Sequence, residues 1–275
     1  MAQLFNRFIQ ERRYLKNVSS RTVEWHEQSL KWLGVEQPTE TDLRDFVLRM
    51  RTAGLKASSV NCRIRSVNAY LAWSGSSLRV PKLKEDSYVP ATYSKTQIHA
   101  ILRWRPRGFF QRRVHVLMLT LLDTGVRLDE ALSLCVQDCN LDDLLLTVTG
   151  KGRTQRVIPF SLELRRWLAK FIMDFGLRAH QFVFSTKQGR KLSARNAFRH
   201  IRGLCDRLGF PAPKRMVHAT RHTFATEYLR RGGSLFHLQK VLGHTSLEMV
   251  RRYANLMTED LQAVHERVSL LTSTR

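Results

Sequence analysis

Three short amphipathic segments follow one another between residues 218 and 257, and they constrain the fold more than any other part of the sequence. Apolar residues recur in each segment at the three- or four-residue steps of a helix. Gly243 stands where a helix-ending glycine is expected, so the chain can turn sharply there. Ser246 is a candidate N-cap for the third helix, which would carry Tyr253. The repeating apolar residues are Phe224 and Tyr228; Leu235, Leu238 and Leu242; and Leu247, Val250, Ala254 and Met257.

Basic residues stand at regular distances from Tyr253 in these segments. A tyrosine is a poor nucleophile at neutral pH, because its pKa is near 10 and ionisation therefore costs about 4 kcal/mol. Guanidinium and imidazole groups gathered around a phosphate could offset that cost. The basic residues form the pattern His218-x-x-Arg221-His222, followed by His244 in Leu-Gly-His.

This pattern resembles the tyrosine recombinase (phage integrase) family, whose signature is His-x-x-Arg-His, then Leu-Gly-His, then a tyrosine nine residues later. Two further family features stand upstream. Thr-Gly-x-Arg-x-x-Glu is present with Arg127 and Glu130, and Lys151 lies between β-rich runs at 144–149 and 154–158, as on the family's hairpin. The resemblance implies the minimal two-domain form, of Xer- and integrase-like type.

The resemblance also implies a reaction. Tyr253 would attack a scissile phosphate and give a 3′-phosphotyrosine, so that strands are cut and rejoined without metal, ATP or any other cofactor. Two arginines would neutralise the phosphate charge, while His218 and Lys151 would move protons and His244 would bind the phosphate or hold the tyrosine. The implied catalytic residues are Arg127, Lys151, His218, Arg221, His244 and Tyr253, with Glu130 orienting the basic cluster.

The charge balance indicates a polyanionic partner. Lys and Arg number 46 against 23 Asp and Glu, which gives a formal net charge of +23. The resemblance implies double-stranded DNA with an inverted-repeat core site, a homotetramer on synapsed DNA, and an accessory directionality factor. No apolar run approaches the length of a membrane span, and no signal core follows the N-terminus. We expect a cytoplasmic, nucleoid-associated protein of a prokaryote.

The predicted fold is mainly α with a small β-sheet. Residues 1–74 contain four amphipathic segments and are expected to form an N-terminal helical bundle that binds DNA. Residues 75–93 are expected to form an interdomain linker, and residues 94–275 an α+β catalytic domain. The resemblance implies that the two domains form a C-shaped clamp on DNA. Residues 261–271 predict a C-terminal helix, which either packs on its own core or exchanges with a neighbouring subunit.

Several arginines are candidates for DNA contact, each with an exposed helix face or loop as the alternative. A basic helix capped by Ser193 is the best candidate for a major groove. Arg156, beside the hairpin tip, is a further candidate for a backbone phosphate. The remaining candidates are Arg63 and Arg65 in the fourth helix, Arg153 on the hairpin, and Arg195, Arg199 and Arg202 in the basic helix.

Other interpretations of the same residues remain. A type IB topoisomerase would share the chemistry without pairing two sites, and a DNA-binding protein that no longer cleaves would need no nucleophile. His218 and His222 have a spacing that suits zinc, without an evident third ligand. Tyr228 is an alternative nucleophile, although its place on an apolar stripe favours packing. Cys135 and Cys139 are expected as reduced thiols on one buried helix end.

Overall fold

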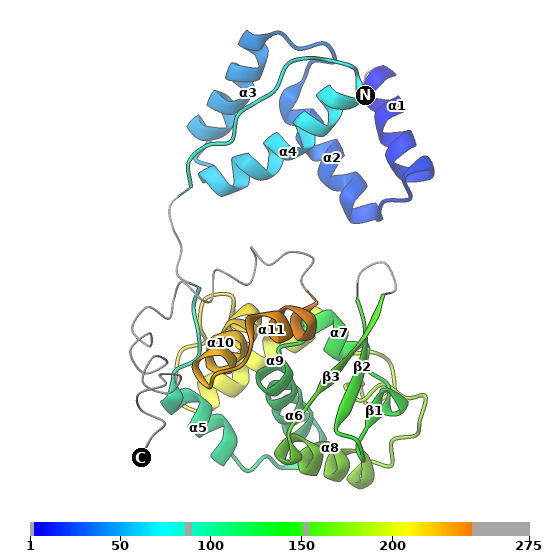
Figure 1. Cartoon of the computed structure of the whole chain (residues 1–275), viewed down its shortest axis with the longest axis vertical. Coiled ribbons are helices and arrows are strands. Elements are labelled where there is room, and N and C mark those ends of the chain that lie inside the picture. Colours follow the sequence, from blue (N-terminus) through cyan, green and yellow to red (C-terminus); the bar gives the residue numbers. More distant parts are fainter. Residues whose placement is uncertain (1–2, 86–89, 151–153, 244–275) are drawn as a thin grey trace, which may run out of the picture. The chain divides into compact units, whose positions relative to one another are not determined.

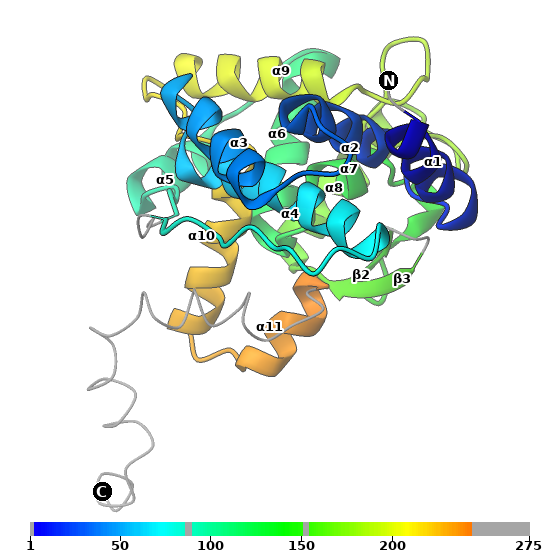
Figure 2. The same cartoon turned by 90° about the horizontal axis from the view of Figure 1, so that it is seen from above.

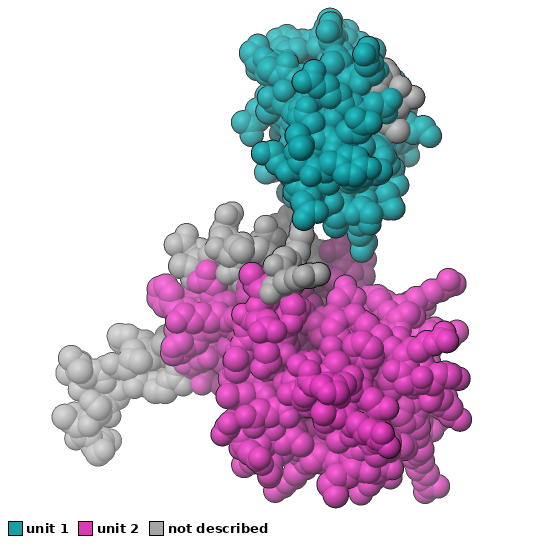
Figure 3. Space-filling view, turned by 90° about the vertical axis from the view of Figure 1, so that its right-hand side faces the viewer, with its two compact units in different colours: residues 1–88 teal, residues 89–275 magenta. Residues whose placement is uncertain are grey.

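The protein has two compact units, residues 1–88 and 89–275 (Figure 3). The computed structural model describes residues 3–85, 90–150 and 154–243. It is mainly helical with one three-stranded sheet, as predicted. Lys151, Arg153, His244, Tyr253 and the predicted C-terminal helix lie outside the described residues. No helix within the described ranges is long and apolar enough to cross a membrane.

Unit 1 is a helical bundle (Figure 1). Its core is formed by one apolar face from each helix, and the largest fully buried side chains there include Phe8, Phe46 and Tyr70. Ser19 caps the second helix by accepting from the backbone N–H of Thr22. The elements are α1 (Gln3–Gln10), a π-helical turn η1 (Glu11–Leu15), α2 (Ser20–Leu33), α3 (Glu40–Thr52) and α4 (Ala57–Trp73).

The chain after α4 returns along that helix. The side-chain amide of Asn68 donates to the carbonyl of Val80 and accepts from its N–H, both at 2.9 Å. Asn61 makes the same pair of bonds with Leu83, both at 2.8 Å. The start of the segment 75–93, interpreted from the sequence as a linker, therefore packs on unit 1. The side-chain amides of Asn61 and Asn68 bond this backbone as a neighbouring strand would. The composition of the segment gives no sign of these contacts, so the sequence predicted a linker there.

Unit 2 is built around α6, which is buried along most of its length. The sheet has the antiparallel order β1-β2-β3, and Leu146 pairs with Ile158 at its centre, both facing the core. Ser94 and Gln97 form a capping box at the start of α5. The elements are α5 (Lys95–Arg103), α6 (Gly108–Thr124), α7 (Leu128–Leu132), a 3-10 turn η2 (Val136–Asp138), β1 (Cys139–Asn140), β2 (Leu145–Thr149), β3 (Gln155–Pro159), α8 (Leu162–Asp174), α9 (Ala194–Arg207), α10 (Met216–Arg230) and α11 (Leu235–Leu242).

The two neighbouring cysteines do not share a helix end, so that expectation is wrong. Cys135 precedes η2, and Cys139 begins β1. The carboxylate of Asp138 accepts from the backbone N–H of Cys135 at 2.8 Å, which closes a tight turn and redirects the chain into the sheet. Both thiols are free, and burial raises the pKa of each.

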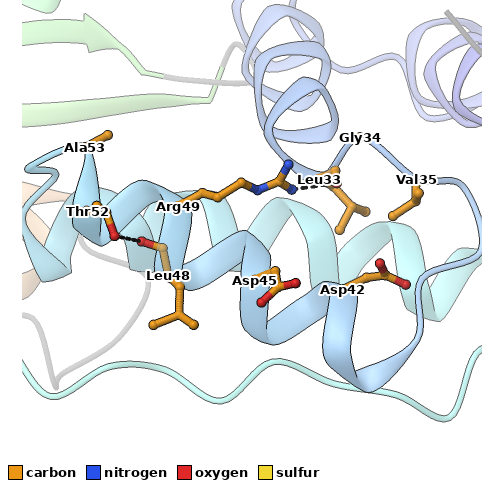
Figure 4. Close-up of a pocket in the computed structure, with 9 residues that line it drawn as sticks. All are labelled: Leu33, Gly34, Val35, Asp42, Asp45, Leu48, Arg49, Thr52 and Ala53. Atoms are coloured by element: carbon orange, nitrogen blue, oxygen red, sulfur yellow. Dashed lines mark hydrogen bonds between the residues drawn. The ribbon is translucent and has the colours of Figure 1, made fainter.

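A groove on unit 1 runs beside α3 (Figure 4). Arg49 extends from α3 and donates to the last carbonyls of α2, those of Trp32 at 2.9 Å and Leu33 at 3.1 Å. This side chain therefore closes the carboxyl end of α2, where helical carbonyls lack partners of their own. The groove is lined by Leu33, Gly34, Val35, Asp42, Asp45, Leu48, Arg49, Thr52 and Ala53, none of which belongs to the predicted site.

Candidate active site

The predicted Thr-Gly-x-Arg turn joins α6 to α7. Gly125 ends α6 with a φ of +63°, a conformation that favours glycine. A Cβ atom at this position would lie 2.4 Å from Cδ1 of Phe224 on α10. The glycine therefore allows the end of α6 to lie against α10, and the chain then leads directly into Arg127.

Arg127 and Glu130 cap the short helix α7. Glu130 accepts from the backbone N–H of Arg127 through Oε2 and from its Nη1 through Oε1, both at 2.9 Å. The side chain of Arg127 is 45% exposed, whereas that of Glu130 is 5% exposed. The carboxylate therefore fixes the base of the arginine and leaves much of the guanidinium open to solvent.

Arg156 reaches the same carboxylate from β3. Its Nη1 donates to Oε1 of Glu130 at 2.9 Å and its Nη2 to Oε2 at 2.8 Å, a two-pronged pair. Burial by itself raises the pKa of Glu130, but the hydrogen bonds and charges of Arg156 and Arg127 outweigh it and lower the pKa to about 2. The carboxylate is ionised at neutral pH. Arg156 was interpreted from the sequence as a phosphate contact, and the structure instead places its guanidinium on Glu130.

Arg221 lies on α10 and is 8% exposed. Its Nη1 donates to the carbonyl of Gly125 at 2.8 Å, and its Nη2 donates to the carbonyl of Leu242 at 2.7 Å. Both acceptors are at helix carboxyl ends, where carbonyls need partners from outside the helix. Arg221 thus joins the ends of α6 and α11.

The carboxyl end of α11 lies beside β3 (Figure 2). Three guanidinium groups meet at this helix end. They come from the residue that precedes α7, from β3 and from α10, which are far apart in the sequence. They donate to three consecutive backbone carbonyls. Gly243 caps the helix with a φ of +63°, as the sequence predicts. The pairs are Arg156 Nε to Val241 at 2.9 Å, Arg221 Nη2 to Leu242 at 2.7 Å and Arg127 Nη2 to Gly243 at 3.5 Å.

Two histidines of the motif flank Arg221 on α10. His218 is exposed and lies one helical turn before Arg221. Burial, followed by electrostatic repulsion from His218, Arg221 and Arg215, lowers the pKa of His222 to about 4. His222 is therefore neutral at pH 7. In the part of the chain that the structure describes, no group of three or more His, Cys, Asp and Glu side chains is placed to hold a metal ion.

The candidate DNA-contact arginines differ in their surroundings. Arg65 is exposed, whereas Arg63 donates to Gln28 on α2 at 3.0 Å and is partly buried. The three candidates on α9, Arg195, Arg199 and Arg202, are all exposed. The opposite side of α9 is anchored to α6 through His200, which lies 3.2 Å from a guanidinium nitrogen of the buried Arg113. Tyr228 packs on Phe224 with ring centroids 5.7 Å apart, which agrees with its predicted packing role.

The partnership of Arg156 with Glu130 was missed, although the sequence carries a signal for it. Side chains alternate between the faces of a strand, so Arg156 lies on the same face as Ile158, which is fully buried. An arginine on the core side of a sheet requires a partner, because an unpaired charge is costly to bury. Glu130 is the carboxylate that meets this requirement.

Comparisons with known proteins agree on one family. The phage integrase family model matches residues 93–260. Among curated relatives, tyrosine recombinase XerA of Pyrococcus furiosus is 29% identical over 245 residues, covering 85% of this chain and 82% of the relative. Tyrosine recombinase XerD of Chlorobaculum tepidum is 26% identical over 270 residues, covering 92% and 88%.

Solved structures show the same fold. The Tn1549 transposon integrase in complex with transposon right end DNA has a TM-score of 0.76 at 20% identity, covering 98% of this chain and all of that one. The XerH site-specific recombinase bound to a palindromic difH substrate has a TM-score of 0.73 at 17% identity, covering 97% and 84%. At these identities the likeness concerns the fold alone.

Proposed function

Because the chain belongs to the phage integrase family, we propose that it exchanges DNA strands through a covalent bond between Tyr253 and a 3′ phosphate. As a site-specific tyrosine recombinase, it acts on double-stranded DNA. Attack by the Tyr253 oxygen on phosphorus forms the phosphotyrosine and releases a 5′-hydroxyl. Attack by a 5′-hydroxyl in the reverse step restores a phosphodiester and frees the tyrosine. The two bonds are of similar energy, so neither ATP nor another cofactor is required.

The convergence of Arg127 and Arg221 at one end of α11 carries this proposal. The side chain of Arg127 is 45% exposed, and Arg221 is fixed between two helix ends. Guanidinium groups so placed can bind the non-bridging oxygens of one phosphate and stabilise the charge that develops on them. His244 follows Gly243 directly in the sequence, so the end of α11 also sets where the next proposed catalytic residue begins.

The remaining assignments concern protons. His218 is exposed and lies on the same face of α10 as Arg221, in reach of solvent and substrate. We assign it the exchange of the tyrosine proton. Lys151 protonates the leaving 5′-oxygen, and His244 donates a hydrogen bond to the phosphate or holds Tyr253. Glu130 orients Arg127 without touching substrate.

The partner and assembly follow the same proposal. The exposed arginines of α9 contact a duplex core site of inverted repeats, helped by Arg65 on α4 and Arg153. Recombination between two such sites brings four protomers together on synapsed DNA, with an accessory factor setting direction. The protein acts in the cytoplasm of a prokaryote, at the nucleoid.

A covalent-trapping experiment tests the function. Wild-type protein is incubated with fragmented genomic DNA in EDTA, the reaction is stopped with SDS, and the fragments retained on protein are sequenced. Adducts at one inverted-repeat site are expected, and the variant Tyr253→Phe should give none. Tyr228→Phe is the matched control and should retain adducts.

The other outcomes are equally informative. Scattered adducts would favour a topoisomerase, and site-specific binding without adducts would favour a protein that does not cleave. Adducts that vanish with Tyr228→Phe but persist with Tyr253→Phe would refute the assignment of the nucleophile. If adducts form without EDTA but not in its presence, the proposed metal-independent chemistry is refuted.

A further inference from the structure

All three nitrogens of the Arg156 guanidinium donate to the protein's own groups. Its two Nη atoms bind both oxygens of Glu130, at 2.9 and 2.8 Å, and its Nε binds the carbonyl of Val241 at 2.9 Å. The side chain is 17% exposed. One residue on β3 therefore ties together α7, through Glu130, and the carboxyl end of α11.

The positive charge of Arg156 affects the net charge around Arg127. Arg127 and Arg156 contribute two positive charges and Glu130 one negative charge, which leaves a net charge of +1 (2 − 1). Without Arg156, Glu130 would neutralise Arg127 and leave a net charge of zero (1 − 1). Since Glu130 is nearly buried, its attraction for Arg127 is weakly screened. Arg156 thus leaves the charge of Arg127 available to a phosphate.

The second contact of Arg156 acts on α11. Val241 precedes Leu242 and Gly243, whose carbonyls accept from Arg221 and Arg127. A Cβ atom at Gly243 would lie 3.0 Å from the guanidinium carbon of Arg156, so the helix end is closely seated on this side chain. A shift of Arg156 would move the same carbonyls that locate the two proposed phosphate-binding arginines.

We propose that Arg156 is a positioning residue for strand cleavage, which acts through Glu130 and the end of α11 and touches neither DNA nor the reacting atoms. This inference rests on the proposed function, because it concerns the same phosphate-binding arginines. A positioning residue differs from a residue that contacts phosphate in one measurable respect. Loss of Arg156 should slow cleavage by bound protein without weakening DNA binding.

The test uses full-length protein and a nicked duplex carrying the site recovered by covalent trapping. Covalent adduct formation is measured in single turnover with saturating protein. Binding is measured by fluorescence anisotropy in the Tyr253→Phe background. We expect Arg156→Gln to slow adduct formation about 100-fold, the effect of a misplaced catalytic group, and to leave the Kd within about three-fold.

A double variant, together with its thermal unfolding, separates positioning from phosphate contact and from simple support of the fold. In Glu130→Gln/Arg156→Gln the carboxylate that would neutralise Arg127 is also gone, so the net charge returns to +1. We expect the double variant to recover about ten-fold of the rate lost in Arg156→Gln. A residue that contacted phosphate would show no such recovery. A residue that only stabilised the fold would recover rate only in step with thermal stability. Arg156→Lys, which keeps one charge beside Glu130 but loses the planar fork, should fall between wild type and Arg156→Gln.

Arg165→Gln is the matched control. Arg165 also donates its Nε to a carbonyl, that of Leu141 at 2.7 Å, and faces a carboxylate, that of Asp142 at 3.7 Å, but lies on α8. It should react at the wild-type rate. Thermal unfolding of every variant identifies misfolding, and Arg156→Lys carries the test if Arg156→Gln does not fold.

Three results would overturn the inference while the proposed function stands. These are a wild-type rate in Arg156→Gln, equal losses of rate and affinity, or a double variant no faster than the single one. Absence of adducts with the wild-type protein, in contrast, would refute the proposed function itself, and the inference with it.

Discussion

Replacing Glu130 by Gln should lower the free energy of unfolding, because it removes a nearly buried carboxylate that forms ion pairs with two arginines. The ordinary pKa of 4.5 and the folded pKa of about 2 correspond, at about 1.4 kcal/mol per pH unit, to about 3 kcal/mol at neutral pH. Breaking a buried ion pair has a similar cost. We therefore expect Glu130→Gln to lose about 3 kcal/mol at pH 7.

The same pKa sets the pH dependence of that loss. The folded pKa lies below the unfolded one, so the stability due to Glu130 is complete above pH 4.5 and disappears as the pH falls towards 2. At pH 3.5, one unit below the unfolded value, the difference between wild type and variant should have narrowed by about 1.4 kcal/mol.

Urea denaturation of the full-length protein at both pH values measures the effect, and hydrogen exchange in α7 locates it in unit 2. Glu163→Gln is the control, because Glu163 and its partner Arg166 are both largely exposed. Its effect should stay below about 0.5 kcal/mol. A loss under about 1 kcal/mol for Glu130→Gln, or a loss that is the same at pH 7 and pH 3.5, would refute the role assigned to the carboxylate.

Two other substitutions test the packing of each unit. Gly125→Ala should destabilise unit 2 by about 2 kcal/mol, because the added methyl meets the ring of Phe224 and the φ is positive; thermal unfolding measures it, and an unchanged Tm would contradict the close approach. Burial, and then the charge of Arg12, lowers the pKa of His26 from 6.5 to about 4, so unit 1 should lose up to about 3 kcal/mol as the pH falls from 6.5 to 4. His26→Leu should remove that pH dependence in urea denaturation followed by hydrogen exchange in α2, and a persisting dependence would contradict it.

Local patterns in the sequence predicted much of the fold. Helix caps depend on neighbouring residues, so Ser94, Ser193 and Gly243 could each be assigned from a few positions, and the structure has all three. The turn that carries Arg127 was found instead from the family resemblance. Features that depend on distant partners were missed, such as the two asparagines of α4 that hold the chain after it.

The division of roles among the arginines shows why a site is harder to predict than a fold. Arg127, Arg156 and Arg221 are chemically identical and all stand in basic motifs, so the sequence offers phosphate contact for each. The structure separates them by what already occupies each guanidinium. Arg156 has both Nη atoms on a carboxylate, Arg221 bridges two helix ends, and Arg127 shares Glu130 while remaining largely exposed.

Because of these surroundings, the free-energy cost of turning to a phosphate differs between Arg127 and Arg156. Arg127 is partly solvated, and its Nη2 contact with the Gly243 carbonyl is long, at 3.5 Å. This nitrogen can turn to a phosphate while Nη1 stays on Glu130, so the buried carboxylate keeps its partner. Arg156 could do so only by abandoning Glu130, a nearly buried carboxylate, which would cost several kcal/mol. The two arginines that share Glu130 therefore differ in their ability to bind a phosphate. Arg156 serves the site by staying on Glu130. Arg127 can then exchange its long contact with the Gly243 carbonyl for a contact with the substrate.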